Sequence, residues 1–144
     1  DDKRGMAEVR ASTDVPISTG ESEFTRFAFR DLAELRACDI FQPDLSICGG
    51  VTEAMRIEAI ASAYQLRYAP HLWGGALTFA AGLHTLVVAS TGFIVEYSLG
   101  ANPMLHELAV EDFTVVDGHL DVPDRPGLGV TVDEAFVEKY RVTD

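Results

Sequence analysis

The stretch DIFQPDLSICGGVTEAMRIEAIASAYQLRYAPH, residues 39–71, contains one complete strand–helix–strand unit. Its first part, DIFQPD, predicts a short strand that ends at Pro43 and Asp44. The segment GGVTEAMRIEAIASAY, residues 49–64, predicts a helix because its apolar residues recur at helical spacing. LRYAPH then predicts a second strand that ends at His71. No hairpin signal joins the two strands, so the unit favours parallel strands with a right-handed crossover.

The same alternation extends to both sides of this unit. Toward the N-terminus we expect a helix over residues 3–12, a strand over 15–19 and a helix over 23–37. Toward the C-terminus, residues 76–90 predict a strongly apolar helix and residues 92–97, GFIVEY, predict a fourth strand. Strands that alternate with helices in this way indicate an α/β fold.

An ionisable residue lies at or near the end of each of the four predicted strands. These residues are Glu21, Asp44, His71 and Glu96, separated by 23, 27 and 25 residues along the chain. A period of about 25 residues is the size of one compact strand–helix unit. Because parallel α/β folds build their sites at the carboxyl ends of the strands, we expect the four groups to converge on one pocket.

Each of these residues also has a simpler interpretation on its own. Asp44 follows Pro43 and could be a turn residue or a helix cap. His71 could be a buried histidine whose hydrogen bonds are satisfied, and Glu96 could be a solvated strand end. The shared position at four successive strand ends favours a site over four separate coincidences.

The length of the chain sets a limit on the architecture. A closed (β/α)₈ barrel needs ~200–250 residues, whereas this chain has 144 residues and four predicted strands. It is therefore either a small open sheet or the last part of a longer protein. Its opening, DDKRGMAE, lacks an initiator Met, as expected of a cut or processed end. After residue 100 the pattern changes to a short helix, a DG turn between two short strands, and a terminal helix capped near Asp133.

Composition restricts the partners of the protein. The net charge of −12 repels phosphate backbones, so we expect no nucleic-acid partner. No apolar run approaches the roughly 18 residues of a membrane span. Only Lys3 and Lys139 of the 11 basic residues are lysines, which suits a halophilic protein as well as an ordinary acidic enzyme. Cys38 and Cys48 are expected to be buried free thiols in a reducing cytosol, which predicts a cytoplasmic protein.

Five motifs together resemble the C-terminal half of the enolase superfamily. They are, in chain order, VPISTGE, DIFQPDLSICGGVTEAMRIEAIA, APHLWGG, IVEY and VPDRPGLGVTVDE. They are most similar to the mandelate racemase subgroup (mandelate racemase/muconate lactonizing enzyme), which includes many sugar-acid dehydratases. The resemblance covers nearly the whole chain and implies the C-terminal portion of a modified TIM barrel, (β/α)₇β, that is incomplete in this chain. Residues 1–100 would then be barrel units, and residues 101–144 a tail outside the barrel strands that packs against the barrel and a capping domain.

The resemblance also implies roles for the residues at the strand ends. Glu21 matches the third carboxylate ligand of an essential Mg²⁺. His71 matches the histidine acid/base, and Asp44 matches the aspartate that pairs with it. Glu96 matches the glutamate that hydrogen-bonds the substrate carboxylate. The first two metal ligands and the second base of the family, usually a lysine, lie on earlier barrel strands and are absent from this chain.

Three further residues lie close to these positions. Trp73 follows His71 in a loop and could wall the pocket and contact substrate, although simple packing is an equal alternative. Gly20 would let the backbone turn close to the metal. His84, in the middle of an apolar helix, is expected to be a packed core histidine.

The resemblance implies an enzyme that abstracts the proton next to a carboxylate through an enediolate intermediate. We expect a lyase that dehydrates a small sugar acid to a 2-keto-3-deoxy acid, in a protein that forms homo-oligomers. A racemase or cycloisomerase acting on a sugar acid or sugar lactone is the alternative within the superfamily. A non-catalytic fragment or partner-binding module is the alternative outside it, and the chain by itself is expected to be inactive.

Overall fold

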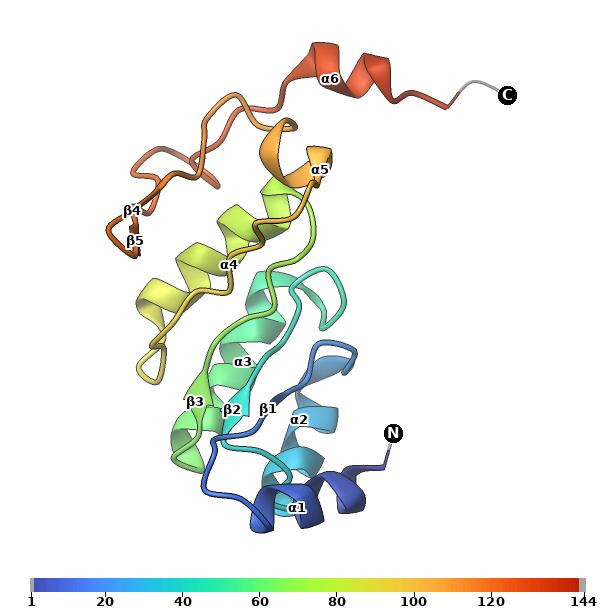
Figure 1. The fold of residues 1–144 in the computed structure, drawn as a ribbon, viewed down its shortest axis with the longest axis vertical. Coiled ribbons are helices and arrows are strands. Elements are labelled where there is room, and N and C mark those ends of the chain that lie inside the picture. Colours follow the sequence, from blue (N-terminus) through green and yellow to red (C-terminus); the bar gives the residue numbers. More distant parts are fainter. Residues whose placement is uncertain (1, 143–144) are drawn as a thin grey trace.

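The computed structural model describes residues 2–142. Asp1 of the predicted barrel units 1–100 and residues 143–144 of the predicted tail 101–144 lie outside the described part. The elements run in the order α1 Lys3–Ala11, β1 Ser18–Thr19, α2 Thr25–Glu34, β2 Ile40–Phe41, α3 Gly50–Ala63, β3 Arg67–Tyr68, α4 Ala76–Val88, α5 Pro103–His106, β4 Val115–Val116, β5 His119–Leu120 and α6 Glu134–Lys139. The alternation of strand and helix as far as α4 confirms the predicted α/β class. Figure 1 shows an elongated molecule with the sheet toward one end and the tail, in orange and red, at the other.

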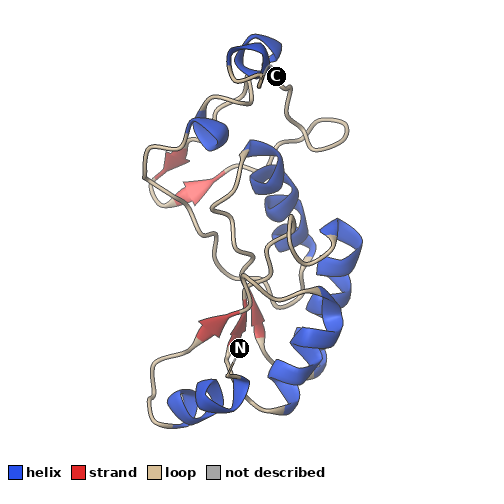
Figure 2. Cartoon of the chain, turned by 90° about the vertical axis from the view of Figure 1, so that its right-hand side faces the viewer, coloured by secondary structure: helices blue, strands red, loops and turns tan. Residues whose placement is uncertain are grey.

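The strands β1, β2 and β3 form one parallel sheet in chain order. Ser18 pairs with Ile40, and Ile40 pairs in turn with Arg67. Each connection passes through a helix, as parallel pairing requires. The longest helices lie on one side of the sheet (Figure 2), so the sheet with its covering helices has the layering of a barrel wall.

The fourth strand, predicted over residues 92–97, does not form. Only Gly92 makes an isolated bridge, to Tyr68 of β3. Alternate N–H groups along the continuation of β3 face this segment, but Pro70 has no N–H to donate. The next donor on that side, the N–H of Leu72, is taken by a side-chain carboxylate. The ladder therefore ends after one bridge, and the rest of the segment is extended without regular pairing.

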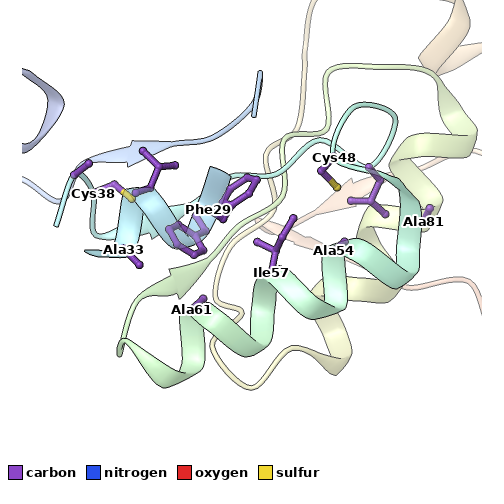
Figure 3. Packing of buried hydrophobic residues seen from close by; sticks show 12 residues of the cluster. Phe29, Ala33, Cys38, Cys48, Ala54, Ile57, Ala61 and Ala81 are labelled. Carbon is purple, nitrogen blue, oxygen red and sulfur yellow. The ribbon is translucent and has the colours of Figure 1, made fainter. Parts of the chain in front are cut away.

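The main core lies between the sheet and the helices α2 and α3 (Figure 3). Phe29 and Phe41 are fully buried and pack edge to face, with ring centroids 5.0 Å apart. Cys38 and Cys48 are buried in this core and form no disulfide, which confirms the prediction that both are buried free thiols. Burial raises the pKa of the Cys38 thiol to about 12 and that of the Cys48 thiol to about 11.

Helix α4 is apolar and mostly buried. On this helix, His84 is partly buried and its Nε2 lies 3.1 Å from the carbonyl oxygen of Leu128, so it packs against the tail as a structural histidine. No helix within residues 2–142 has both the length and the apolar content needed to cross a membrane.

The tail packs against α4 through a second core cluster, which consists of Leu72, Phe79, Leu83 and Leu105. The predicted turn at Asp117–Gly118 joins β4 to β5 in an antiparallel hairpin. Helix α6 begins after Asp133, whose carboxylate accepts the N–H groups of Ala135 and Phe136 at 2.8 and 3.2 Å. The cap at Asp133 is therefore also confirmed.

Candidate functional site

Asp44 and His71 lie side by side just beyond the carboxyl ends of β2 and β3. Their backbones form a parallel bridge, in which the His71 N–H donates to the Pro43 carbonyl at 3.0 Å. Their side chains meet as well, with His71 Nδ1 2.9 Å from Asp44 Oδ2. Because a carboxylate can only accept hydrogen bonds, Nδ1 carries the proton, and in the neutral ring Nε2 has a free lone pair.

Asp44 is held as a buried carboxylate, 3% exposed. The N–H of Ser46 donates to its Oδ1 at 2.7 Å, and the Ser46 hydroxyl donates to the same oxygen. Burial alone would raise the pKa of the Asp44 carboxyl. The hydrogen bonds from Ser46 and His71 outweigh burial, so this pKa lies below its usual value. The acceptor of the His71 proton is therefore an ionised group.

Glu21 meets the other side of the His71 ring. Its Oε2 lies 3.5 Å from His71 Nε2. The Glu21 side chain is 62% exposed, whereas that of His71 is 14% exposed. The free ring nitrogen thus faces a solvated carboxylate at the edge of the sheet where the strands have their carboxyl ends.

Gly20, just before Glu21, is a position that only glycine fits easily. Its φ is +129°, and a Cβ there would lie 2.5 Å from Cε1 of the buried Phe29 ring. This close approach to the core accounts for the glycine, and the turn close to a metal stays a prediction. The strand can therefore pack tightly on Phe29 and still turn Glu21 outward.

Glu96 is anchored to the residue that follows His71. Its Oε2 accepts the N–H of Leu72 at 2.9 Å. In the same loop, the Asn102 side-chain amide donates to the carbonyl oxygen of Gly74 at 3.1 Å. Trp73, between these two contacts, is 65% exposed, which argues against simple packing within this chain and leaves its role as a pocket wall a prediction.

The structure thus brings Glu21, Asp44 and His71 into direct contact and ties Glu96 to the same loop. Ser46 and the Leu72 N–H are site groups that the sequence reasoning missed. The contact with Ser46 could have been found, because an aspartate side chain in a turn commonly binds the backbone N–H two residues on. The bond between Glu96 and Leu72 joins residues 24 positions apart and leaves no local signal.

Of the residues at the site, Glu21 is the one whose carboxylate is available to bind a metal ion. Within residues 2–142, no three His, Cys, Asp or Glu side chains are grouped so that they could hold a metal ion. Glu21 offers an exposed carboxylate, the ligand type that Mg²⁺ prefers. Asp44 is committed to Ser46 and His71. The residues present therefore fit one ligand of a larger oxygen set.

The chain resembles known proteins over nearly its full length. Residues 1–136 match the family described as enolase C-terminal domain-like. The chain is 40% identical over 139 residues to the D-galactonate dehydratase of Ralstonia pickettii (strain 12J), an overlap that covers 91% of this chain and 36% of that protein. It thus spans about a third of the length of the curated relatives it matches.

Solved structures agree with the sequence relatives. The mandelate racemase/muconate lactonizing enzyme from Jannaschia sp. CCS1 superposes with a TM-score of 0.89 at 33% identity, covering 100% of this chain and 36% of that one. The 3,6-anhydro-D-galactonate cycloisomerase from Zobellia galactanivorans superposes with a TM-score of 0.89 at 34% identity, covering 96% of this chain and 39% of that one. The parallel strands and covering helices are thus part of an α/β barrel that is incomplete in this chain, and the chain belongs to the enolase C-terminal domain-like family, in the mandelate racemase subgroup of the enolase superfamily.

Proposed function

We propose that this chain forms the C-terminal part of an Mg²⁺-dependent sugar-acid dehydratase, which converts its substrate to a 2-keto-3-deoxy acid through an enediolate. The observation that carries the proposal is the Asp44–His71 pair, whose free Nε2 faces the carboxylate of Glu21. The relatives named D-galactonate dehydratase support a sugar acid as the substrate class and dehydration as the reaction.

The chain's own residues have defined tasks in this proposal. Asp44 holds the proton on Nδ1 of His71, so that Nε2 is the atom that exchanges a proton with the substrate. In dehydration, the α-proton goes to a base, and the departing hydroxyl takes a proton from Nε2 of the doubly protonated His71 ring and leaves as water, which returns the ring to its Nδ1–H form. Glu96, anchored through Oε2, would contact the substrate carboxylate.

Glu21 is the residue in this chain that would hold the metal. When bound, Mg²⁺ would offset the negative charge that grows on the substrate carboxylate as the α-proton leaves. In the family, further carboxylates on earlier barrel strands complete the ligand set. A single carboxylate binds Mg²⁺ weakly, so we propose that the 144 residues alone are inactive.

The test is His71→Asn in the complete protein. We expect turnover to be lost and Mg²⁺ affinity to be unchanged, because Asn keeps a polar side chain but cannot supply the proton. His84→Asn is the matched control, since this histidine lies on α4 and bonds to the tail. Turnover that survives His71→Asn, measured with a substrate that the wild type converts, would show that the assignment is wrong.

Isomerisation is the second candidate. The superposition on a cycloisomerase at 34% identity favours it specifically, and a racemase would use the same proton abstraction. A screen of sugar acids and sugar lactones separates the two reactions, because dehydration gives a 2-keto-3-deoxy product and isomerisation retains the composition of the substrate.

The alternative of a non-catalytic role can be tested by reading the sequence encoded upstream of this chain in the gene. A Lys-x-Lys strand followed by Asp and Glu at two later strand ends would complete the catalytic set and remove this alternative. We also propose that residues 1–100 are barrel units and residues 101–144 a tail that packs on the barrel and a capping domain. The cytoplasmic location, the homo-oligomeric state and the halophilic origin remain predictions.

A further inference from the structure

Ser46 and His71 form hydrogen bonds to different oxygens of the Asp44 carboxylate. Ser46 gives both its N–H, at 2.7 Å, and its hydroxyl to Oδ1. His71 Nδ1 lies 2.9 Å from the other oxygen, Oδ2. The loop backbone supports this arrangement, because the N–H of Cys48 donates to the Asp44 carbonyl at 2.7 Å and folds the loop back over the aspartate.

A carboxylate needs such a constraint because its terminal torsion is soft. Rotation about χ2 of an aspartate is broad, so the plane of its carboxylate turns at little cost. Two donors on Oδ1 remove this freedom. We propose that Ser46 is a positioning residue that holds Oδ1 of Asp44, so that Oδ2 remains the fixed acceptor for the Nδ1 proton of His71.

Burial makes the contribution of Ser46 difficult to replace. Asp44 is almost fully buried, while Ser46 itself is at the surface. Loss of the hydroxyl leaves the buried carboxylate with one donor fewer, so that the Ser46 N–H alone holds Oδ1. With a single donor on Oδ1 the carboxylate turns more easily about χ2, and the imidazole then lacks a fixed acceptor for its Nδ1 proton. The kinetic consequence of this inference rests on the proposed function, whereas the geometric consequence does not.

The sharpest comparison uses two variants of the same shape. Ser46→Thr keeps the hydroxyl and Ser46→Val replaces it by a methyl group, so both carry the same branched side chain. Ser90→Val is the matched control, because the Ser90 hydroxyl also donates to a buried carboxylate, that of Glu58, at 2.8 Å, and neither residue belongs to the site. Ser46→Ala gives the comparison without branching should the valine variant fail to fold.

The first readout is the ¹⁵N NMR signature of the His71 ring in the 144-residue chain, with the imidazole neutral. We expect the Nδ1–H tautomer in the wild type, in Ser46→Thr and in Ser90→Val, and a mixture of tautomers in Ser46→Val. The same tautomer in the valine and threonine variants would overturn the proposal, and so would a mixture in both.

The second readout is the steady-state kinetics of the complete protein. We expect Ser46→Val to lower kcat roughly tenfold, the lower end of the loss seen when an outer partner of a metal-bound histidine is removed, with KM unchanged and kcat restored by Ser46→Thr. A valine variant with the wild-type kcat would count against Ser46. If the complete protein has no dehydratase or isomerase activity, the proposed function fails, while the NMR comparison still decides the role of Ser46.

Discussion

Replacing Gly20 by alanine should destabilise the chain strongly. The residue has a φ of +129°, where a side chain strains the backbone by about 1–3 kcal/mol. The new Cβ would also lie 2.5 Å from Cε1 and 2.9 Å from Cζ of Phe29. Since Phe29 is fully buried and packs on Phe41, its ring cannot move without disturbing the core, and overpacking of this kind costs about 1–3 kcal/mol. Together we expect a loss of about 2–6 kcal/mol from a total that is typically ~5–15 kcal/mol.

Urea unfolding of the chain, followed by far-ultraviolet circular dichroism, measures this loss. Gly50→Ala is the matched control, because Gly50 also has a positive φ, +81°, but a Cβ there would meet nothing within 4 Å. It should show the backbone contribution alone. If Gly20→Ala costs no more than Gly50→Ala, the contact with Phe29 does not explain the glycine, and the account of how the strand delivers Glu21 is wrong.

Four other outcomes follow from the site, the core and the surface charge. Folding lowers the pKa of Asp44, so its charged form stabilises the folded chain at pH values above the unfolded pKa of about 4. This stabilisation is lost as the pH falls through the folded pKa. Asp44→Asn should therefore flatten this part of the curve of unfolding free energy against pH. Cys38 and Cys48 should react with a thiol reagent only after unfolding in urea, since both are buried and their pKa values are raised; rapid labelling of the native chain would contradict their burial. Phe41→Ala should cost about 3–5 kcal/mol in urea unfolding, with the higher value expected if the cavity does not collapse. Stability should rise from low to molar KCl if the charge of −12 reflects a halophilic source, and an unchanged midpoint would remove that hypothesis.

The helices were predictable because their signals are local. The apolar spacing over residues 23–37 and 49–64 matches α2 and α3 to within a few residues at each end. The strands were harder, since pairing depends on partners that are distant in the sequence. Residues 15–19 contribute only Ser18–Thr19 to the sheet, and residues 92–97 fail because Pro70 removes a donor on the neighbouring strand.

The proximity of the site residues was predictable from their positions at the ends of successive predicted strands. Parallel strands place successive carboxyl ends at one edge, so Glu21, Asp44 and His71 could be expected together before their distances were known. Their hydrogen-bond partners could not be predicted in the same way. The sequence does not show that Ser46 gives two donors to one oxygen, or that Glu96 binds a backbone N–H, because both depend on the path of a loop.

Trp73 provides an intrinsic fluorescence probe of the loop that follows His71. It is the single tryptophan of the sequence, it lies two residues after His71, and it is 65% exposed. Its fluorescence should therefore have the long-wavelength maximum of a hydrated indole, with no second tryptophan to obscure it. Any ligand, polypeptide segment or neighbouring subunit that covers this loop should shift the emission to shorter wavelength. Occupancy of the site can thus be followed by titration without a label and without turnover.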